Sequence, residues 1–539
     1  MPAPPFRSPL RAIALSAALL AASLPSIAAT PRDGALDRGF GLNGLSRPLS
    51  GDSEEGLDAI AVQDDGRVLA LSRDHKGPVG TYRCRLLRLR EDGRIDTGFG
   101  RDGQVRFGLP FGSGWSSCDH LALLPDGKIL IVGRLESQPM LMRFNPDGSA
   151  DTDFGDGGMA VFDTGIDFGL AAFARQADGA IVLAGTGGYP AAPRHGYAVA
   201  VRLRADGSAD TGFGVGGVSI TDFPTARYGG YIEHVALQAD GRIVMAGTVQ
   251  ERGLLLMRLR ADGRLDTEFG RDGRVVESYR FASYGIQGFA LQSDGSILTS
   301  HDVWPSAPHL PWRGTVVRHH PDGRFDYRFR RPDLESPGRL TVLADGRATV
   351  AYYRIGETPR IGMQRFAMDG SVDPAFVLEP FDTGDVFARV REIAVDNGGR
   401  IVLGIDSGSF DQYTIARVHN RTYCFADPAN PGRFLGFSPS GWFASADSGV
   451  GGSGAGVAAK ARLRRIDLPG QAPAYALSAG GPAPAAYRID AFARIDGDGR
   501  GSAFANAAVR REGDGYDPGR YALIDPRTND SACRLRSGR

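Results

Sequence analysis

The chain lacks an excess of charge of either sign, and this excludes several classes of partner. Of its 539 residues, 62 are Lys or Arg and 62 are Asp or Glu. A protein that binds nucleic acid or anionic lipid by electrostatic attraction carries a surplus of basic residues in a patch or stripe. We therefore expect neither nucleic acid nor an anionic membrane surface among the partners.

Long apolar runs and motifs that carry chemistry are also scarce. Beyond residue 30, no stretch approaches the roughly 18 apolar residues that a membrane-spanning helix needs. The nine histidines show no zinc-ligand spacing, and there is no Gly-x-Ser-x-Gly, P-loop or dinucleotide fingerprint. Neither Asp-box nor tryptophan-docking repeats occur. The sequence thus predicts no membrane span, no metal, no cofactor and no recognisable catalytic residue.

The one apolar run of note lies at the N-terminus. Arg7 and Arg11 give a basic start, an apolar stretch from Ala12 to Leu24 follows, and "SIAAT" ends it with small residues. This order is typical of a secretory signal peptide cut near Ala28 or Ala29. We expect residues 1–29 to be removed and the remainder to be secreted, to the periplasm or beyond. A retained helical anchor is the alternative.

Cysteine is rare, with four in the chain. In a secreted protein these four predict disulfides. Pairing Cys84 with Cys118 and Cys424 with Cys533 keeps each bridge within one region of the chain, so we favour that arrangement. Free buried thiols are the alternative.

Glycine, by contrast, is abundant at 75 residues, and it recurs in two interleaved repeats. The first follows a strand-like stretch, as in "LQADGRIVMAG" from Leu237. The second reads "DGALDRGFG", "DGRIDTGFG", "DGSADTDFG", "DGSADTGFG", "DGRLDTEFG", "DGRFDYRFR" and "DGSVDPAFV", beginning at Asp33, Asp92, Asp147, Asp206, Asp262, Asp322 and Asp369. From Asp33 to Asp369 is 336 residues over six intervals, a mean period of 56. Such a period indicates a stacked or circular array.

Within one period the pattern predicts four antiparallel strands. In the fourth copy, "YIEHVALQ", "RIVMAGTV", "LLLMRLR" and "GRVVESY" are strands joined by "DG" turns or loops. Four strands per unit and seven units predict an all-β fold, a seven-bladed β-propeller over residues 30–419. The chain enters the pattern at "DGALDRGFG" and leaves it after "IARVH" at His419. The two half-units would complete one blade and close the ring.

These two signatures closely resemble those of the delta-60 repeat family of exported bacterial proteins. The resemblance covers about Asp33 to His419 and implies a propeller-like array, with no catalytic residue to carry over. The sixth and seventh copies depart from it at Arg330 and Val377, where the other copies have the final glycine.

The repeat pattern stops near Asn420. "AAYRIDAFARI" and "GSAFANAAVRR" alternate apolar and polar residues around "DGDGRG", which predicts a hairpin. We expect residues 420–539 to form a small β-rich domain linked by Cys424 and Cys533. Part of it faintly resembles the β-region of minor type IV pilin-like subunits.

The motif "DGRLDTEFG" allows two interpretations, a calcium loop or an elaborate turn. Calcium needs six or seven oxygen ligands, and only Asp262 and Asp266 recur as acids. An arginine lies four residues before each later "DG", Arg258 in this copy. On a strand packed between blades its guanidinium would be buried and would need a partner. We therefore expect a structural turn in which Arg258 pairs with Asp266 and Phe269 packs between blades.

Strand direction predicts which face of the ring binds a ligand. The two "DG" turns of each unit lie on one side, and the longer, variable connections lie on the other. There we place a set of aromatic and charged candidates at and beside the channel mouth: Trp304, Trp312, His309, Trp115, Asp119, Glu233, Asp58 and Arg391. Aromatic rings beside carboxylates suit sugars or extended polypeptide. We predict a monomeric, non-enzymatic propeller that binds an extracellular glycan or protein. Alternatives are a pilus-associated appendage component and a carbohydrate-active hydrolase or lyase.

Overall fold

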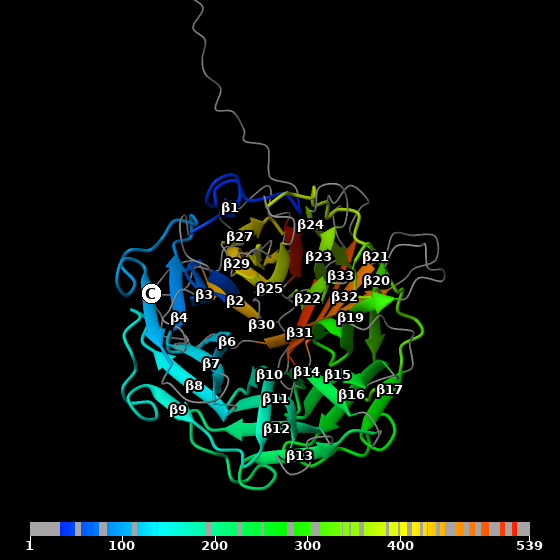
Figure 1. Cartoon of the computed structure of the whole chain (residues 1–539). Helices are drawn as coiled ribbons and strands as arrows, with labels where there is room; N and C mark the ends of the chain where they lie inside the picture. The colour runs from blue at the N-terminus through cyan, green and yellow to red at the C-terminus, as the bar shows by residue number, and fades with distance from the viewer. Residues whose placement is uncertain are drawn as a thin grey trace, which may run out of the picture. The chain divides into compact units, whose positions relative to one another are not determined.

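Seven sheets arranged around a common centre dominate the structure (Figure 1). The computed structural model describes residues 33–420, apart from 49–54, 75–82, 110–115, 137, 189–195, 225–228, 250–252, 278–284, 304–312, 337, 344–345, 355–359, 384–387, 397–398 and 407–411, and the backbone of eight strands between residues 424 and 524. Within these residues every regular element is a β-strand. The chain is therefore all-β and contains a seven-bladed β-propeller, as the repeats predict.

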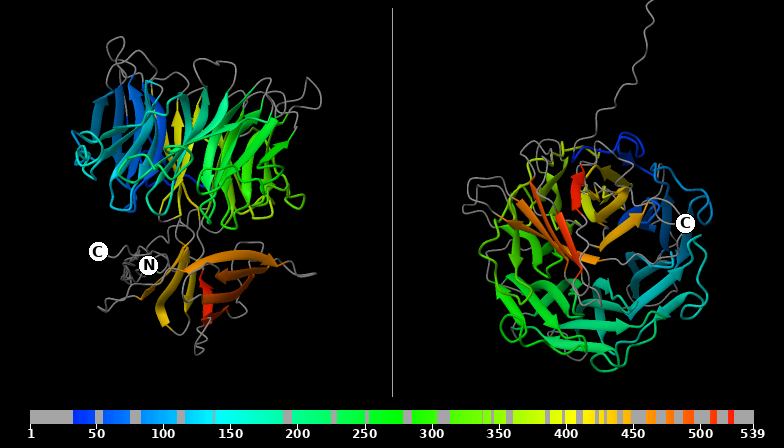
Figure 2. Two further views of the ribbon diagram at one scale, coloured as in Figure 1. Left: turned by 90° about the horizontal axis from the view of Figure 1, so that it is seen from below. Right: turned by 180° about the vertical axis from the view of Figure 1, so that it is seen from behind.

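Each blade is an antiparallel sheet whose first strand lies nearest the centre and whose later strands follow outward in chain order (Figures 1 and 2). The first blade comprises β2 (Glu55–Val62), β3 (Val68–Asp74), β4 (Arg83–Leu89) and β5 (Gln104–Gly108). The second comprises β6 (Ser117–Leu123), β7 (Ile129–Leu135), β8 (Gln138–Phe144) and β9 (Met159–Val161). The third comprises β10 (Asp167–Arg175), β11 (Ile181–Gly188), β12 (Tyr197–Leu203) and β13 (Val218–Asp222). The fourth comprises β14 (Gly230–Leu237), β15 (Ile243–Val249), β16 (Gly253–Leu259) and β17 (Arg274–Glu277). The fifth comprises β18 (Ile286–Leu291), β19 (Ile297–Val303), β20 (Arg313–His319) and β21 (Asp333–Leu334). The sixth comprises β22 (Gly338–Val342), β23 (Ala348–Arg354) and β24 (Arg360–Phe366).

The seventh blade is built from both ends of the repeat region. It contains β25 (Arg389–Val395), β26 (Ile401–Asp406), β27 (Tyr413–Val418) and, as its outer strand, β1 (Leu45–Ser46). β1 pairs with β27 in antiparallel register, Leu45 opposite Ala416. This is the closure that the two half-units predict, and it leaves no open sheet edge between the first and last blades.

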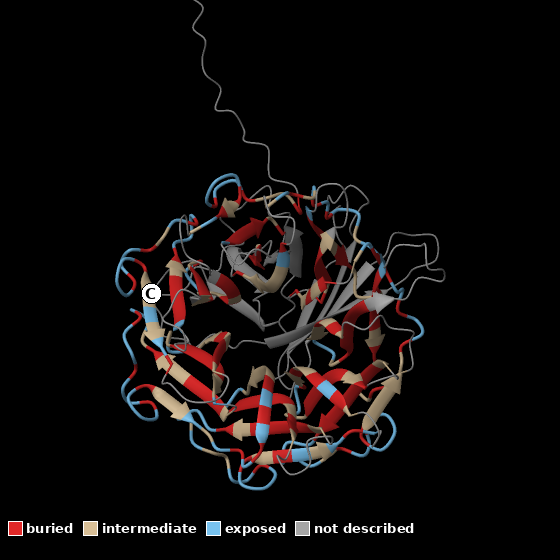
Figure 3. Cartoon of the chain, in the orientation of Figure 1, coloured by how far each residue is buried: buried red, intermediate tan, exposed pale blue. Residues whose placement is uncertain are grey.

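The cores lie between neighbouring blades, because the middle strands are covered on both faces. Ile243–Ala246 and Leu254–Met257 are completely or almost completely buried. One apolar cluster joins Leu71 and Leu86 of the first blade to Ile131 and Met140 of the second. Figure 3 shows the same pattern around the ring, with buried residues on the middle strands and exposed ones at the outer rim. Blade-on-blade packing explains why these strands are continuously apolar rather than alternating.

The motif "DGRLDTEFG" forms a turn in which each recurring residue has a structural partner. Asp262 Oδ1 accepts from the N–H of Arg264 at 3.0 Å, which closes the turn on itself. Arg258 Nε donates to Asp266 Oδ2 at 2.8 Å, and its guanidinium lies 4.8 Å from the centre of the Phe269 ring. Burial raises the pKa of Asp266, but Arg258, the N–H of Glu268 and Arg242 together hold that pKa below its usual value. In the part of the chain that the structure describes, no group of acids or histidines could hold a metal ion.

The same arginine also joins each blade to the next. Arg258 Nη1 donates to the carbonyl of Pro321 in the fifth blade at 2.7 Å. Six further arginines pair with the second aspartate of their own turn and stack on its phenylalanine: Arg88, Arg143, Arg202, Arg318, Arg365 and Arg417. Arg417 completes the circle, since it binds Asp37 and the carbonyl of Glu91 in the first blade. The turn is therefore a clamp between blades.

The final glycine of the motif gives the turn before the outer strand a tight backbone geometry. Gly270 has φ +57°, and a Cβ there would lie 2.3 Å from the carbonyl oxygen of Arg274. Arg330 replaces this glycine in the fifth blade, where the outer strand β21 has two residues. Val377 replaces it in the sixth, and there the described residues form three strands instead of the four expected. The glycine alone does not set the length of the outer strand, because the seventh blade keeps Gly41 and its outer strand β1 also has two residues.

The C-terminal region is also entirely β in its described backbone. Eight antiparallel strands close into a barrel: β28 (Cys424–Asp427), β29 (Asn430–Phe437), β30 (Trp442–Asp447), β31 (Ala459–Ile466), β32 (Ala474–Ala479), β33 (Tyr487–Arg494), β34 (Ala507–Arg511) and β35 (Arg520–Ile524). β33 pairs with β34 as the expected hairpin. The boundaries 29/30 and 419/420 remain predictions. The pairing of Cys424 with Cys533 lies outside the described side chains.

Replacing Gly270 with Ala should destabilise the fourth blade, because the new Cβ would overlap the Arg274 carbonyl and the backbone would stay at positive φ. We expect a loss of about 1–3 kcal/mol in the free energy of unfolding, measured by urea denaturation. Gly108→Ala is the matched control, since nothing lies within 4 Å of a Cβ at that position. Equal losses for the two variants would contradict the strained-turn explanation.

Replacing Arg258 with Ala should destabilise the protein by roughly 3 kcal/mol, because Asp266 would keep its charge in a buried site without its main partner. The control is Arg260→Ala, whose half-exposed side chain lies 3.7 Å from Asp266 and should contribute less than about 1 kcal/mol. Thermal and urea unfolding of both variants test this. Losses of the same size would show that the clamp is not specific to Arg258.

Candidate functional site

The inner strands share a backbone irregularity close to where each begins. Six of the seven carry a β-bulge at the same place, for example between Leu57 and Ala59 in β2. A bulge inserts one residue and changes the direction of its side chain, and bulges are frequent beside functional sites. The inserted residues are Asp58, Asp119, Ala171, Glu233, Gln287 and Arg391. We call them the bulge ring.

The bulge ring contains all four charged residues that the sequence places at the channel mouth. Asp58, Asp119, Glu233 and Arg391 occupy one register position in four different blades, and each is partly accessible to solvent. The four remaining candidates, Trp115, Trp304, His309 and Trp312, lie outside the described residues.

A second set of side chains, one residue further along each inner strand, escaped the sequence reasoning. These residues lie seven positions before the glycine of the first "DG" or "GG" turn of each repeat, and we call them the second ring: Ala59, His120, Ala172, His234, Gly288, Arg339 and Glu392. The spacing was available in the sequence. In the six bulged strands the bulge hid the set, because it changes the direction of successive side chains from that of a regular strand; β22, which carries Arg339, has no bulge.

Electrostatic interactions connect the charged and titratable residues of the second ring across the centre of the propeller. The charge of Arg339, in the sixth blade, lowers the pKa values of His120 in the second blade and His234 in the fourth, although burial is the larger cause in both. It also opposes the rise in the pKa of Glu233 that burial causes. The sixth blade borders neither the second nor the fourth, so these interactions cross the channel.

The first two blades form the acidic side of the channel. Asp58 Oδ1 lies 2.8 Å from Arg73 Nε, whereas its buried Oδ2 has no hydrogen-bond partner. Burial raises the pKa of Asp58 well above its usual value, which Arg73 opposes and the nearby charge of Asp119 reinforces. Asp119 accepts a hydrogen bond from the Ser117 hydroxyl at 2.6 Å, and Arg134 Nε lies 3.8 Å away.

Glu233 and Glu392 also link neighbouring inner strands by hydrogen bonds. Glu233 Oε2 accepts from the N–H of Ile286 in the next blade at 2.6 Å, and Glu392 Oε2 accepts from the N–H of Ile60 at 2.8 Å. Burial raises the pKa of Glu392 to about 7, against the opposing effects of the Ile60 hydrogen bond and the charge of Arg339. Near neutral pH this carboxyl group therefore changes between its acid and its base form.

The two histidines are neutral at physiological pH. Burial lowers the pKa of His234 to about 4, and its Nε2 lies 2.9 Å from the carbonyl oxygen of Ile286. A neutral imidazole must donate from that nitrogen, so Nδ1 is left as an acceptor. Burial likewise lowers the pKa of His120, which hydrogen-bonds the backbone of Ala171. Both rings can thus accept hydrogen bonds from a ligand.

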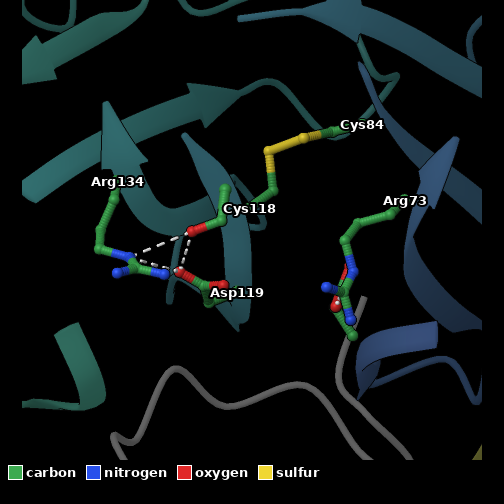
Figure 4. The surroundings of a disulfide bond; sticks show 7 residues. Arg73, Cys84, Cys118, Asp119 and Arg134 are labelled. Carbon is green, nitrogen blue, oxygen red and sulfur yellow. Dashed lines mark hydrogen bonds and ion pairs between the residues drawn. A yellow bond between two sulfur atoms is a disulfide. The ribbon is translucent and has the colours of Figure 1, made fainter. Parts of the chain in front are cut away.

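A disulfide fixes one part of this arrangement. Cys84 on β4 is bonded to Cys118 on β6, next to the bulge residue Asp119, and both cysteines are fully buried. The predicted pairing of these two is confirmed. Figure 4 shows Asp119 and Arg134 on one side of the bridge and Arg73 on the other. Cross-linking residues 34 apart stabilises a fold by about 3–4 kcal/mol in the chain-entropy treatment. A disulfide is also consistent with a location outside the reducing cytoplasm.

Two surface depressions lie elsewhere, on the side of the "DG" turns. One of about 480 Å³ is lined by Arg67, Arg90 and Arg417 with Asp65, Glu91 and Asp92. Another of about 860 Å³ lies between the outer turns of the first two blades, beside Arg101 and Asp147. We favour the channel over both, because they are shallow and the charged groups that line the first are already paired. Arg67 binds Asp65 and Arg417 binds Asp37.

Comparison with known proteins supports the fold and names no function. Residues 124–154 and 238–269 match the family described as "Domain of unknown function (DUF5122) beta-propeller", which supports a propeller repeat family. No curated protein matches the chain. Among the described residues, no helix has the length and apolarity needed to cross a membrane.

Several solved structures are similar to this chain at low identity and low TM-score. Inactive virginiamycin B lyase from Staphylococcus aureus with quinupristin is 12% identical over 70% of this chain and 99% of that one, with a TM-score of 0.40. The β-propeller domain of the Trilobed protease from Pyrococcus furiosus is 8% identical over 69% and 95%, at 0.39. Drosophila Plexin A in complex with Semaphorin 1b is 10% identical over 72% and 87%, at 0.33. At these identities and TM-scores, no function of these proteins can be assigned to this chain.

The raised pKa of Glu392 predicts a specific dependence of stability on pH. The folded protein keeps this proton up to about pH 7, whereas the unfolded chain releases it near 4.5. Relative to Glu392→Gln, the wild type should therefore lose on the order of 3 kcal/mol of stability as pH rises from 4.5 to 7, and no more above that. Urea unfolding across this range measures the difference. A constant difference would contradict the prediction; Glu268→Gln, at an exposed position, is the control.

Proposed function

We propose that this protein is a secreted, non-enzymatic propeller that binds a glycan or a protein at the face where its inner strands begin. The observation that carries the proposal is the bulge ring. It holds Asp58, Asp119, Glu233 and Arg391 in one register on the inner strands of four blades. Ala171 occupies the same position in the third blade, so the fold does not require an ionisable residue there.

The arrangement of turns and loops supports the choice of face. All "DG" turns lie on one side, where their residues are used for hydrogen bonds within and between blades, such as Gly270 N–H to the carbonyl of Asp322 at 2.8 Å. The variable connections follow from strand direction as belonging to the opposite side, and the sequence predicts Trp304 and Trp312 for one of them. Loops that a rigid scaffold does not need for its own stability are the usual site of recognition.

A carbohydrate-active hydrolase or lyase is the second candidate, and the channel carboxyls favour it. Asp58 and Glu392 both have raised pKa values, as groups that transfer protons in catalysis do. Incubating the mature protein with each glycan it binds, followed by mass spectrometry, separates the two functions. Shortened or unsaturated products that disappear in Glu392→Gln would support catalysis, whereas intact glycans would support binding alone.

The binding face is tested by replacing both Trp304 and Trp312 with Ala. On a glycan array and in titrations with any glycan it reveals, the variant should lose at least tenfold in affinity and keep the wild-type melting temperature, because stacked aromatic rings supply much of the binding energy for sugars. Arg101→Ala, an exposed change on the "DG" side, is the control. Unchanged affinity in the tryptophan variant with a loss in Arg101→Ala would place binding on the other face.

A further inference from the structure

Arg339 differs from the other arginines at the channel in having no carboxylate partner. Arg73, Arg134 and Arg391 lie 2.8, 3.8 and 2.7 Å from Asp58, Asp119 and Asp406 respectively. No carboxylate of the described chain lies within 4.0 Å of Arg339. Its one hydrogen bond runs from Nη1 to the carbonyl oxygen of Gln287 in the neighbouring blade, at 3.4 Å.

This position leaves most of the guanidinium unsatisfied. Arginine has five N–H donors in a planar fork, and one long bond uses a single one of them. The side chain is half-buried, so water replaces the missing partners poorly, and burial lowers the pKa of Arg339 below its usual value. Each of the seven clamp arginines, by contrast, binds an aspartate and an acceptor in the next blade.

The nearby carboxyl groups of Glu392 and Glu233 cannot pair with Arg339 in their present positions. Glu392 and Glu233 act on Arg339 over a distance, and each has one oxygen committed to a backbone N–H of a neighbouring inner strand. Moving either toward Arg339 would break that hydrogen bond between blades. The fork is therefore free to bind an anion that comes from outside, in the paired geometry that arginine forms with carboxylates.

The surroundings indicate what kind of anion fits. Asp119, Glu233 and Glu392 would repel a phosphate monoester with about two charges more strongly than a carboxylate with one. His120 and His234 each keep one ring nitrogen as an acceptor, and Asp119 keeps carboxylate oxygens accessible to solvent. Acceptors around one cation suit a ligand that carries a single carboxylate next to several hydroxyl groups.

We propose that Arg339 is the anion-binding residue of the channel and that its ligand is an acidic glycan. The carboxylate of a uronic acid pairs with the guanidinium, and the sugar hydroxyls donate to the free nitrogens of His120 and His234. This rests on the proposed function, because the glycan enters from the face where the inner strands begin. It adds a charge requirement and a binding residue that the bulge ring alone does not give.

Calorimetric titration of the mature protein with a tetrasaccharide of galacturonic acid tests the proposal. The wild type should bind it, and the methyl-esterified tetrasaccharide, which has the same hydroxyls without the charge, should bind roughly 30-fold more weakly or worse. Arg339→Gln should lose a similar factor for the acid and almost none for the ester. Arg339→Lys should recover part of the loss, since it restores the charge without the fork.

Stability separates a binding role from a structural one. No carboxylate loses a hydrogen-bonded partner in Arg339→Gln, which removes only the charge that acts on Glu233 and Glu392 from a distance, so its melting temperature should stay close to that of the wild type. A clear drop would assign Arg339 to the fold and overturn the proposal. Arg389→Gln, an exposed change on β25, is the matched control.

The outcomes distinguish this proposal from the one it rests on. Binding of neutral glycans with no preference for the acid would overturn the role of Arg339 and leave the binding propeller intact. Equal affinities of the wild type for the acid and the ester would also overturn the role of Arg339 alone. Equal affinities of the wild type and Arg339→Gln for the acid would do so too. Failure to bind any glycan, charged or neutral, would remove the glycan-binding function and this proposal together.

Discussion

The arginine–aspartate pair at the outer turn is the interaction on which the rest of this structure depends. Each guanidinium binds an aspartate of its own blade, stacks on a phenylalanine of the same turn and donates to an acceptor in the following blade, as Arg88 does to Pro146. Seven such links run round the ring, and Arg417 makes the one across the chain's own junction. A buried arginine is stable only with such partners, so the sheets can pack in one order and one orientation.

Because the clamp and the short turns occupy one side, the opposite ends of the inner strands are free to vary. The bulges exploit this freedom, since an extra residue near the start of a strand disturbs neither the turn nor the middle strands. Glu233 and Glu392 show that the freedom is partial, because each also joins two inner strands by a hydrogen bond to a backbone N–H. The channel residues thus combine a structural and an exposed role, and Cys84–Cys118 holds the position next to Asp119.

Much of the fold could be predicted because it repeats. The repeated "DG" turns predict seven blades and their closure, and the arginine four residues before "DG" points to the clamp. The channel was harder to predict, because a bulge depends on strand register rather than on local pattern. His120, His234 and Glu392 therefore looked like ordinary strand residues, and Arg339 lies on β22, which has no bulge and no other local signal. Val377 marks where the sixth blade departs from the motif, but the motif alone does not predict that its described residues form three strands. The closed barrel of β28–β35 could not be predicted, because its sequence contains no internal repeat.

Within one chain, arginine serves two opposite purposes, and the difference lies in its partners. At the rim, Arg258 binds Asp266, Gln238 and Pro321, so it stabilises the blades. In the channel, Arg339 has a single long bond to Gln287 and carboxyl groups that are held back by other hydrogen bonds. Proteins satisfy nearly all of their buried polar groups, and those left short of partners concentrate at functional sites. Because the seven clamp arginines are all paired with carboxylates, the lack of a carboxylate partner at Arg339 indicates that a ligand supplies it.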